Sequence, residues 1–182
     1  FDISKKMIRQ AIESARHGGY HDRATFFVGD GNQLAFKSES FEYVQAYGVL
    51  HHLPNPGQTV REAARILKPG ARFFAKEGNK TPLRGIFDWT MRLFPLWQEE
   101  AGPEPLVSSA MVEEWCRGLP VDHQIAYRVY LPPHLLNVLG NTGACWLLRL
   151  TDLLLSHIPG IRTVAGLILI TLYKRGPSPE AG

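Results

Sequence analysis

Two aspartates, Asp2 and Asp30, each follow a short apolar stretch that is typical of a β-strand. The carboxyl ends of parallel strands form the rim at which open α/β sheets bind ligands. Asp2 could accept hydrogen bonds from both ribose hydroxyls of a nucleotide, and Asp30 from an exocyclic amine, with the Gly31 amide donating to a ring nitrogen. Because neighbouring strands lie about 5 Å apart, one adenosine could span both carboxylates. The ordinary alternatives are a helix cap for Asp2 and a common Gly-Asp-Gly turn for Asp30.

A third strand end carries the paired histidines of Tyr47-Gly48-Val49-Leu50-His51-His52. Gly48 would let a ligand approach the backbone closely. His51 or His52 could act as a general base, because an imidazole can exchange a proton near neutral pH. Adjacent histidines point in different directions, so at most one should face a pocket. Structural, substrate-contacting and metal-binding roles all stay open for the pair, although no further metal ligands follow at a suitable spacing.

The elements that must position these residues follow the order strand, helix, strand, strand, helix, strand. Ser4 suits the N-cap of the first helix, and Gly18-Gly19 suits its end. The spacing predicts these elements at residues 1–3, 4–17, 25–28, 41–49, about 58–67, and 72–76. This alternation at short intervals favours an α/β fold with a mostly parallel sheet.

The pattern changes after Glu77. An apolar helical stretch at 83–97 and a second helix ending at Arg117 suggest a helical lid over residues 81–117. An extended segment at 121–131, a long apolar helix at about 134–157 and a β-rich strand at 163–173 follow. The composition of residues 176–182 predicts a disordered tail.

The composition describes one domain of 182 residues with a net charge of +3. The basic residues are scattered, which argues against binding to nucleic acid. Two distant cysteines, Cys116 and Cys145, favour reduced thiols in the core of a cytoplasmic protein. Charged residues and a proline interrupt the apolar region 144–173, so no membrane span is expected, while peripheral membrane contact stays open. Because the chain opens with Phe1, we expect a fragment or a processed form.

Three segments together resemble the class I S-adenosylmethionine-dependent methyltransferases: FDISKKMIRQA, FFVGDGNQLAFKSESFEYVQAYGVLHHLPNP and REAARILKPGARFFAKEGN. The likeness is greatest to the small-molecule branch that includes the ubiquinone/menaquinone methyltransferases. It implies a doubly wound, mostly parallel sheet whose final strand is antiparallel, within a domain covering residues 1–175. The motifs run from Phe1 to Asn79, in the family's order and spacing.

The resemblance assigns roles to individual residues. It implies that S-adenosylmethionine binds at the strand ends, through Asp2, Ile3, Asp30, Gly31, Tyr47 and Gly48. It implies substrate contacts at the end of the next strand and beside the histidines, through His52, Glu77 and Asn79. We choose His51 as the catalytic residue that removes a proton from the acceptor. No metal site is expected.

One departure from the family concerns its glycine-rich loop of GxGxG type, which precedes the acidic strand end and is absent from this sequence. That loop lets the backbone approach the methionine portion of the cofactor. The chain therefore also lacks the family's first strand and helix, and we expect upstream sequence to supply them.

The sequence favours methyl transfer to a small, partly apolar acceptor, catalysed mainly by holding the reactants together and excluding water. A non-catalytic relative that binds a protein or a lipid is the alternative, and the absent loop favours it. A Rossmann-type dehydrogenase fits poorly, because the Gly-Asp-Gly turn and the histidine pair have no obvious nicotinamide role.

Overall fold

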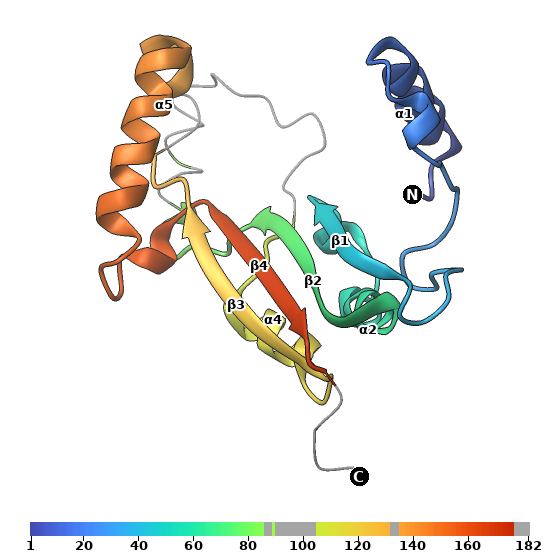
Figure 1. Ribbon diagram of the computed structural model, residues 1–182. Coiled ribbons are helices and arrows are strands. Elements are labelled where there is room, and N and C mark those ends of the chain that lie inside the picture. The colour runs from blue at the N-terminus through green and yellow to red at the C-terminus, as the bar shows by residue number, and fades with distance from the viewer. Residues whose placement is uncertain (86–88, 90–104, 132–134, 177–182) are drawn as a thin grey trace.

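The computed structural model describes residues 1–85, 89, 105–131 and 135–176, without the side chains of 135–141. Its sheet has the strand order β1-β2-β4-β3 (Figure 1). Strands β1 and β2 are parallel, and β4 runs antiparallel to both β2 and β3. The expected antiparallel final strand and its partner are therefore present. The bounds are β1 Phe41–Tyr47, β2 Leu67–Gly78, β3 Val121–Arg128 and β4 Leu167–Lys174.

Four helices accompany the described strands: α1 Lys5–His17, α2 Pro56–Ile66, α4 Ser109–Cys116 and α5 Leu135–Leu155. Ser4 caps α1 as predicted, because its hydroxyl accepts a hydrogen bond from the Met7 amide. Helix α2 begins two residues earlier than expected. Asn55 caps it and Pro56 is its first residue, a position where no backbone N–H is needed.

The core lies on the face of the sheet that α2 and α4 cover (Figure 1). Alternate residues of β2 point into it, including Phe73 and Ala75, as the period of two in a strand requires. Helix α2 contributes Val60, Ala63 and Ala64, which lie on one face of the helix and are buried. On the opposite face, Tyr43 and Tyr47 are about half exposed.

The expected buried strand at 25–28 is wrong. The segment makes only an isolated parallel bridge between Val28 and Asp2, and Phe27 and Val28 are 46% and 50% exposed. The described residues place no strand against the outer edge of β1, which pairs with β2 alone. With α1 standing apart from the sheet in Figure 1, this N-terminal segment has too few neighbours to be buried.

The two cysteines differ, which corrects the expectation that both lie in the core. Cys116 is buried, whereas Cys145 is exposed. Burial raises the pKa of the Cys116 thiol to about 11, so little reactive thiolate forms near neutral pH. We predict that iodoacetamide modifies one thiol of the native protein quickly and the second only in denaturant. Peptide mass spectrometry should place the fast adduct on Cys145, and equal rates at both sites would contradict the described packing.

Within the described residues, no helix combines the length and apolar character that a bilayer crossing requires.

Candidate functional site

The structure brings the two predicted nucleoside-binding strand ends side by side. The Asp2 amide donates to the Phe27 carbonyl (3.2 Å), and the Gly29 amide donates to the Asp2 carbonyl (3.0 Å). Asp30 is the next residue after Gly29. Asp2 and Asp30 therefore lie on neighbouring parallel segments, the arrangement that a shared adenosine would need.

Each aspartate also makes a local hydrogen bond to the backbone, as expected if Asp2 caps a helix and Asp30 belongs to a turn. Asp2 Oδ1 accepts a hydrogen bond from the Ser4 amide (2.7 Å), and Asp30 Oδ1 accepts one from the Asn32 amide (2.8 Å). Each contact uses one carboxylate oxygen and orients the side chain. The second oxygen of each carboxylate makes no hydrogen bond to any residue that the structure describes. Local capping and ligand binding are thus compatible at both positions.

The Asp30 turn lies beside the loop that follows β1. A Cβ atom built on Gly31 would lie 3.7 Å from a methyl carbon of Leu53 and 3.7 Å from one of Thr59. Leu53 comes directly after the paired histidines. The Asp30 turn therefore lies close to the loop at the carboxyl end of β1. The segments that carry Asp2, Asp30 and the paired histidines thus lie in one region. Ile3, proposed to contact the adenine, is 72% exposed.

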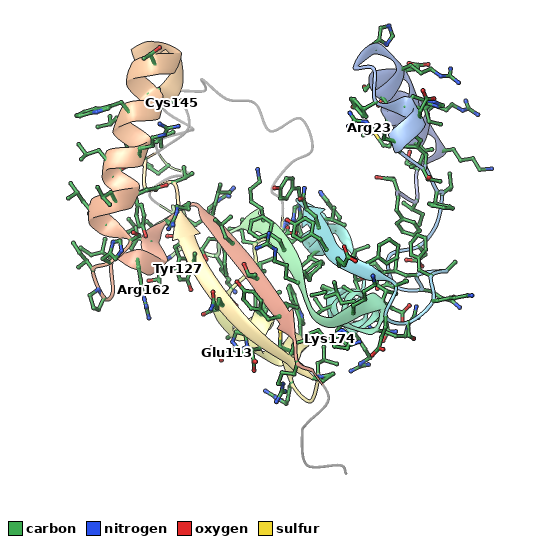
Figure 2. The ribbon with its side chains drawn as sticks, viewed as in Figure 1. Arg23, Glu113, Tyr127, Cys145, Arg162 and Lys174 are labelled. Atoms are coloured by element: carbon green, nitrogen blue, oxygen red, sulfur yellow. The ribbon has the colours of Figure 1, made fainter. Side chains whose placement is uncertain are left out.

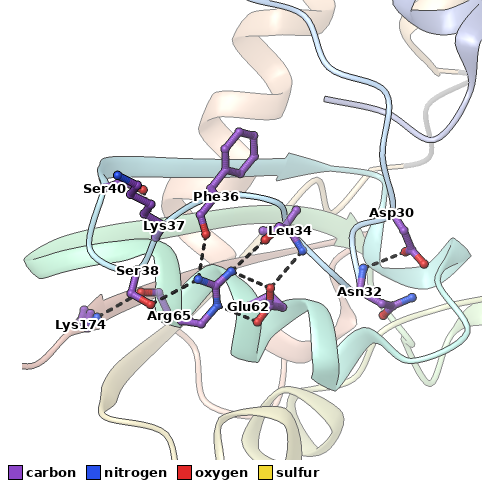
Figure 3. Close-up of polar contacts among 10 residues, drawn as sticks. All are labelled: Asp30, Asn32, Leu34, Phe36, Lys37, Ser38, Ser40, Glu62, Arg65 and Lys174. Atoms are coloured by element: carbon purple, nitrogen blue, oxygen red, sulfur yellow. Dashed lines mark hydrogen bonds and ion pairs between the residues drawn. The ribbon is translucent and has the colours of Figure 1, made fainter.

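Helix α2 holds the loop that follows Asp30 through three side chains on one face. Thr59 Oγ1 donates to Asn32 Oδ1 (3.0 Å), and Glu62 Oε2 accepts from the Leu34 amide (3.0 Å). Arg65 donates to the carbonyls of Leu34 and Phe36, at 2.9 Å each (Figure 3). Thr59, Glu62 and Arg65, which we call the α2 ladder, recur every three residues and so face the same side.

Two members of the α2 ladder, Glu62 and Arg65, also form an ion pair with each other. Arg65 Nε and Nη2 donate to the two Glu62 oxygens at 2.9 and 2.8 Å (Figure 3). This bidentate pair lowers the pKa of Glu62 and raises that of Arg65. Both side chains therefore stay charged while they hold backbone groups of the loop. Sequence reasoning missed the ladder, although its Thr-x-x-Glu-x-x-Arg spacing was a signal for one shared helix face.

A buried carboxylate organises the end of β1. Glu77, at the end of β2, is 1% exposed. Its Oε1 accepts from the amides of Val49 (3.1 Å) and Leu50 (3.0 Å), and its Oε2 lies 2.5 Å from His51 Nδ1. One carboxylate thus joins the loop after β1 to the end of β2, and its contact with Nδ1 fixes the orientation of the His51 ring.

The remaining predicted residues surround this centre. Gly48 has φ +58°, which favours glycine, and its amide donates to the Lys76 carbonyl (2.8 Å). Tyr47 is 52% exposed, with Lys76 Nζ 5.1 Å from its ring centre. The ring of exposed His52 packs on His51, with centroids 3.9 Å apart.

Asn79 has a different environment from these exposed side chains. It is buried, and its amide nitrogen donates to the carbonyls of Thr163 and Ala165 at 2.9 and 2.7 Å. These bonds tie the end of β2 to the segment before β4. Its substrate-contacting role, like the roles of His52 and Glu77, stays a prediction. Among the described residues, no group of three potential ligands could hold a metal ion.

Comparison with known proteins connects this geometry to a family. Residues 1–75 match the family described as "Methyltransferase domain". The matched segment carries both aspartates, the paired histidines and the α2 ladder. Residues 1–75 are therefore similar to this methyltransferase family. The resemblance to class I S-adenosylmethionine-dependent methyltransferases is thereby confirmed.

Two curated relatives with methyltransferase names match part of the chain. The chain is 37% identical over 70 residues to 27-O-demethylrifamycin SV methyltransferase of Amycolatopsis mediterranei, covering 38% of this chain and 26% of that protein. It is 30% identical over 104 residues to the ubiquinone/menaquinone biosynthesis C-methyltransferase UbiE of Bartonella tribocorum, covering 57% and 38% respectively. The chain thus spans well under half the length of these relatives.

The fold extends the likeness beyond the matched segment. The YcgJ protein from Bacillus subtilis superposes with a TM-score of 0.62 at 19% identity, over 96% of this chain and 81% of YcgJ. At that identity the comparison concerns the fold alone. The expected Rossmann-like α/β class is confirmed, with a mixed and open four-stranded sheet in the part of the methyltransferase chain that the structure describes.

Proposed function

We propose that this chain forms part of an enzyme that transfers a methyl group from S-adenosylmethionine to a small-molecule acceptor. The observation that carries the proposal is the isolated parallel bridge between Asp2 and Val28, which sets Asp2 and Asp30 on neighbouring segments within the matched region. The names of the curated relatives support a small-molecule acceptor. The cytoplasmic location expected from the cysteines stays a prediction.

The residues fit the adenosine portion of the cofactor. Asp2 and Asp30 each have one carboxylate oxygen engaged locally and a second oxygen available for ribose hydroxyls and the adenine amine, respectively. Ile3 offers an exposed apolar contact, and Gly31 and Gly48 let the backbone approach a ligand. When bound, S-adenosylmethionine supplies an electrophilic methyl group on its sulfonium sulfur.

The Glu77–His51 pair supports a role for His51 in handling the acceptor proton. Glu77 fixes the ring and keeps the proton on Nδ1, which leaves Nε2 as the basic atom. Because both side chains are almost fully buried, at 0% and 5% exposed, water does not compete for the pair. In this proposal His51 accepts the proton of the acceptor group, and Glu77 is a positioning residue.

The segment predicted to cover the methyl acceptor is described only in part. Residues 86–88 and 90–104 of the predicted lid at 81–117 lie outside the described residues, as does the tail beyond Gly176. The alternative function, binding of a protein or lipid without catalysis, is favoured by the absence of a GxGxG loop in this sequence. Cofactor binding discriminates between the two functions.

Calorimetric titration with S-adenosylhomocysteine tests the site. We expect Asp2→Ala and Asp30→Ala to weaken binding by about 1–3 kcal/mol each, because each leaves ligand donors without an acceptor. The titration uses the 182-residue chain and, in a second arm, the same chain joined to a strand and glycine-rich loop of GxGxG type. The added loop should raise the affinity at least about tenfold, or about 1.4 kcal/mol.

The matched control is Asp22→Ala, which removes an exposed aspartate from the segment between the two predicted binding residues. Its affinity should equal that of the unchanged chain. Unaltered affinity in both site variants would mean that the adenosine lies elsewhere. An absence of binding heat in both arms would contradict the enzymatic proposal and favour the non-catalytic one.

A further inference from the structure

Helix α5 and the loop after it carry large apolar side chains that are exposed in the part of the protein that the structure describes. Trp146 and Leu153 are each 65% exposed, and Leu154 is 57% exposed. The spacing of seven between the first two places them on the same helix face. Ile158 and Ile161, each about 40% exposed, continue the surface past the end of the helix. We call these five residues the α5 patch.

The charges around the α5 patch have one sign. Arg149 is exposed on α5 and lies between Trp146 and Leu153 in sequence, while Arg162 and His157 are exposed beyond Leu154. Figure 2 shows Arg162 near one end of α5 and Cys145 farther along the helix, which lies at the margin of the molecule. Neither arginine forms an ion pair within the described part of the chain.

The only acidic residue of α5 faces the protein instead. Asp152 Oδ1 accepts a hydrogen bond from the Val129 amide (2.8 Å), and its Oδ2 lies 4.0 Å from Arg128 Nε. From Leu135 to Lys174 the sequence contains no other acidic residue. The outer surface of α5 thus combines exposed apolar groups with basic groups and carries no acidic side chain.

We propose that the α5 patch is a docking surface for a lipid bilayer with anionic headgroups. Helices with apolar side chains on one face and basic residues beside them lie in the membrane interface, where Trp and Leu enter the acyl boundary and arginines contact phosphates. The charge favours this occupant over a second copy of the chain, because a symmetric contact would bring the same arginines together. The surface requires no bound cofactor.

Co-sedimentation with vesicles tests the docking surface. The native chain should bind vesicles of phosphatidylglycerol and phosphatidylcholine, and bind them less as the salt concentration rises. The double variant Trp146→Glu/Leu153→Glu should bind at least about tenfold more weakly, since it places charges where apolar groups enter the interface. The matched control is Met7→Glu, which alters a side chain 51% exposed on α1 and should leave binding unchanged.

The basic residues give a second readout. Arg149→Gln/Arg162→Gln should lower binding to anionic vesicles by about fivefold for each charge removed, without changing the weaker binding to phosphatidylcholine alone. Trp146→Phe should keep the binding while reducing the quenching of tryptophan fluorescence by brominated lipids. These two results distinguish headgroup attraction from nonspecific adhesion.

Three results would overturn the inference. The first is no sedimentation of the native chain with anionic vesicles, and the second is equal binding by the native chain and the glutamate double variant. The third is a lipid-free dimer that the double variant abolishes, since the patch would then join two copies of the chain. Circular dichroism of each variant checks that the fold is retained, as expected for substitutions at exposed positions.

Discussion

Replacing Glu77 by alanine should lower the free energy of unfolding by about 3–5 kcal/mol, because the loss of a buried charged partner leaves its neighbours unsatisfied. Three groups lose their acceptor: the amides of Val49 and Leu50 and the ring nitrogen of His51. Water cannot replace the carboxylate without entering the core, since Glu77 is 1% exposed. Urea-induced unfolding followed by circular dichroism measures the change.

Two variants separate the buried network from a general effect of charge. Glu77→Gln keeps the shape of the side chain and one carbonyl acceptor, so it should lower the free energy of unfolding by less, about 1–3 kcal/mol. Glu42→Ala removes an exposed glutamate of β1 whose ion pair with Lys68 is on the surface, and it should leave the unfolding midpoint nearly unchanged. A Glu77→Ala variant as stable as the Glu42→Ala control would contradict the network.

The order of the main elements could be predicted from the sequence because local signals coincide there. Ser4 and Gly18-Gly19 bracket α1, and the alternation of apolar residues in β2 places Phe73 and Ala75 inward. Boundaries were harder to predict. Strand β2 begins at Leu67, directly after α2, because the chain turns at Gly70 with φ +78° and resumes its pairing with β1 at Arg72.

The segment at 25–28 could not be predicted correctly because burial depends on neighbours rather than on composition. Its apolar residues suit a strand, but the described structure gives it only the bridge to Asp2. A sequence pattern reports what a segment could bury and not which partner is present to cover it. For the same reason, the exposure of Cys145 on α5 was not foreseen.

The candidate site was predictable where a residue's place in an element determines its direction. The positions of Asp2 and Asp30 were predicted from the ends of two short apolar segments, and their proximity from parallel pairing of those segments. The contact between Glu77 and His51 could not be predicted in this way, because the two residues are 26 positions apart and are brought together by the pairing of β1 with β2. The α2 ladder likewise joins Glu62 to the Leu34 amide and Arg65 to the carbonyls of Leu34 and Phe36, 28 to 31 residues earlier in the chain.

Replacing Arg65 by methionine should lower the free energy of unfolding by about 2 kcal/mol, because four charge-assisted bonds disappear, two to Glu62 and two to backbone carbonyls. Methionine keeps an apolar stem against the helix, so the polar contacts are the main loss. Figure 3 shows that these bonds join α2 to the loop between Asn32 and Ser38. Hydrogen exchange should therefore accelerate at the Leu34 amide, which donates a hydrogen bond to Glu62.

The control is Arg61→Met, on the same helix, because the Arg61 guanidinium donates to the Gln58 side chain of that helix and not to any loop residue that the structure describes. A pH series gives a further test, since Arg65 lowers the pKa of Glu62 in the folded state. That pair stabilises the fold above the ordinary value of 4.5, and the contribution is lost as the pH falls through the lowered pKa. Arg65→Met should therefore lose less stability than the native chain between neutral and acidic pH. If Arg65→Met and Arg61→Met behave alike in hydrogen exchange and in this pH series, α2 does not hold the loop that follows Asp30.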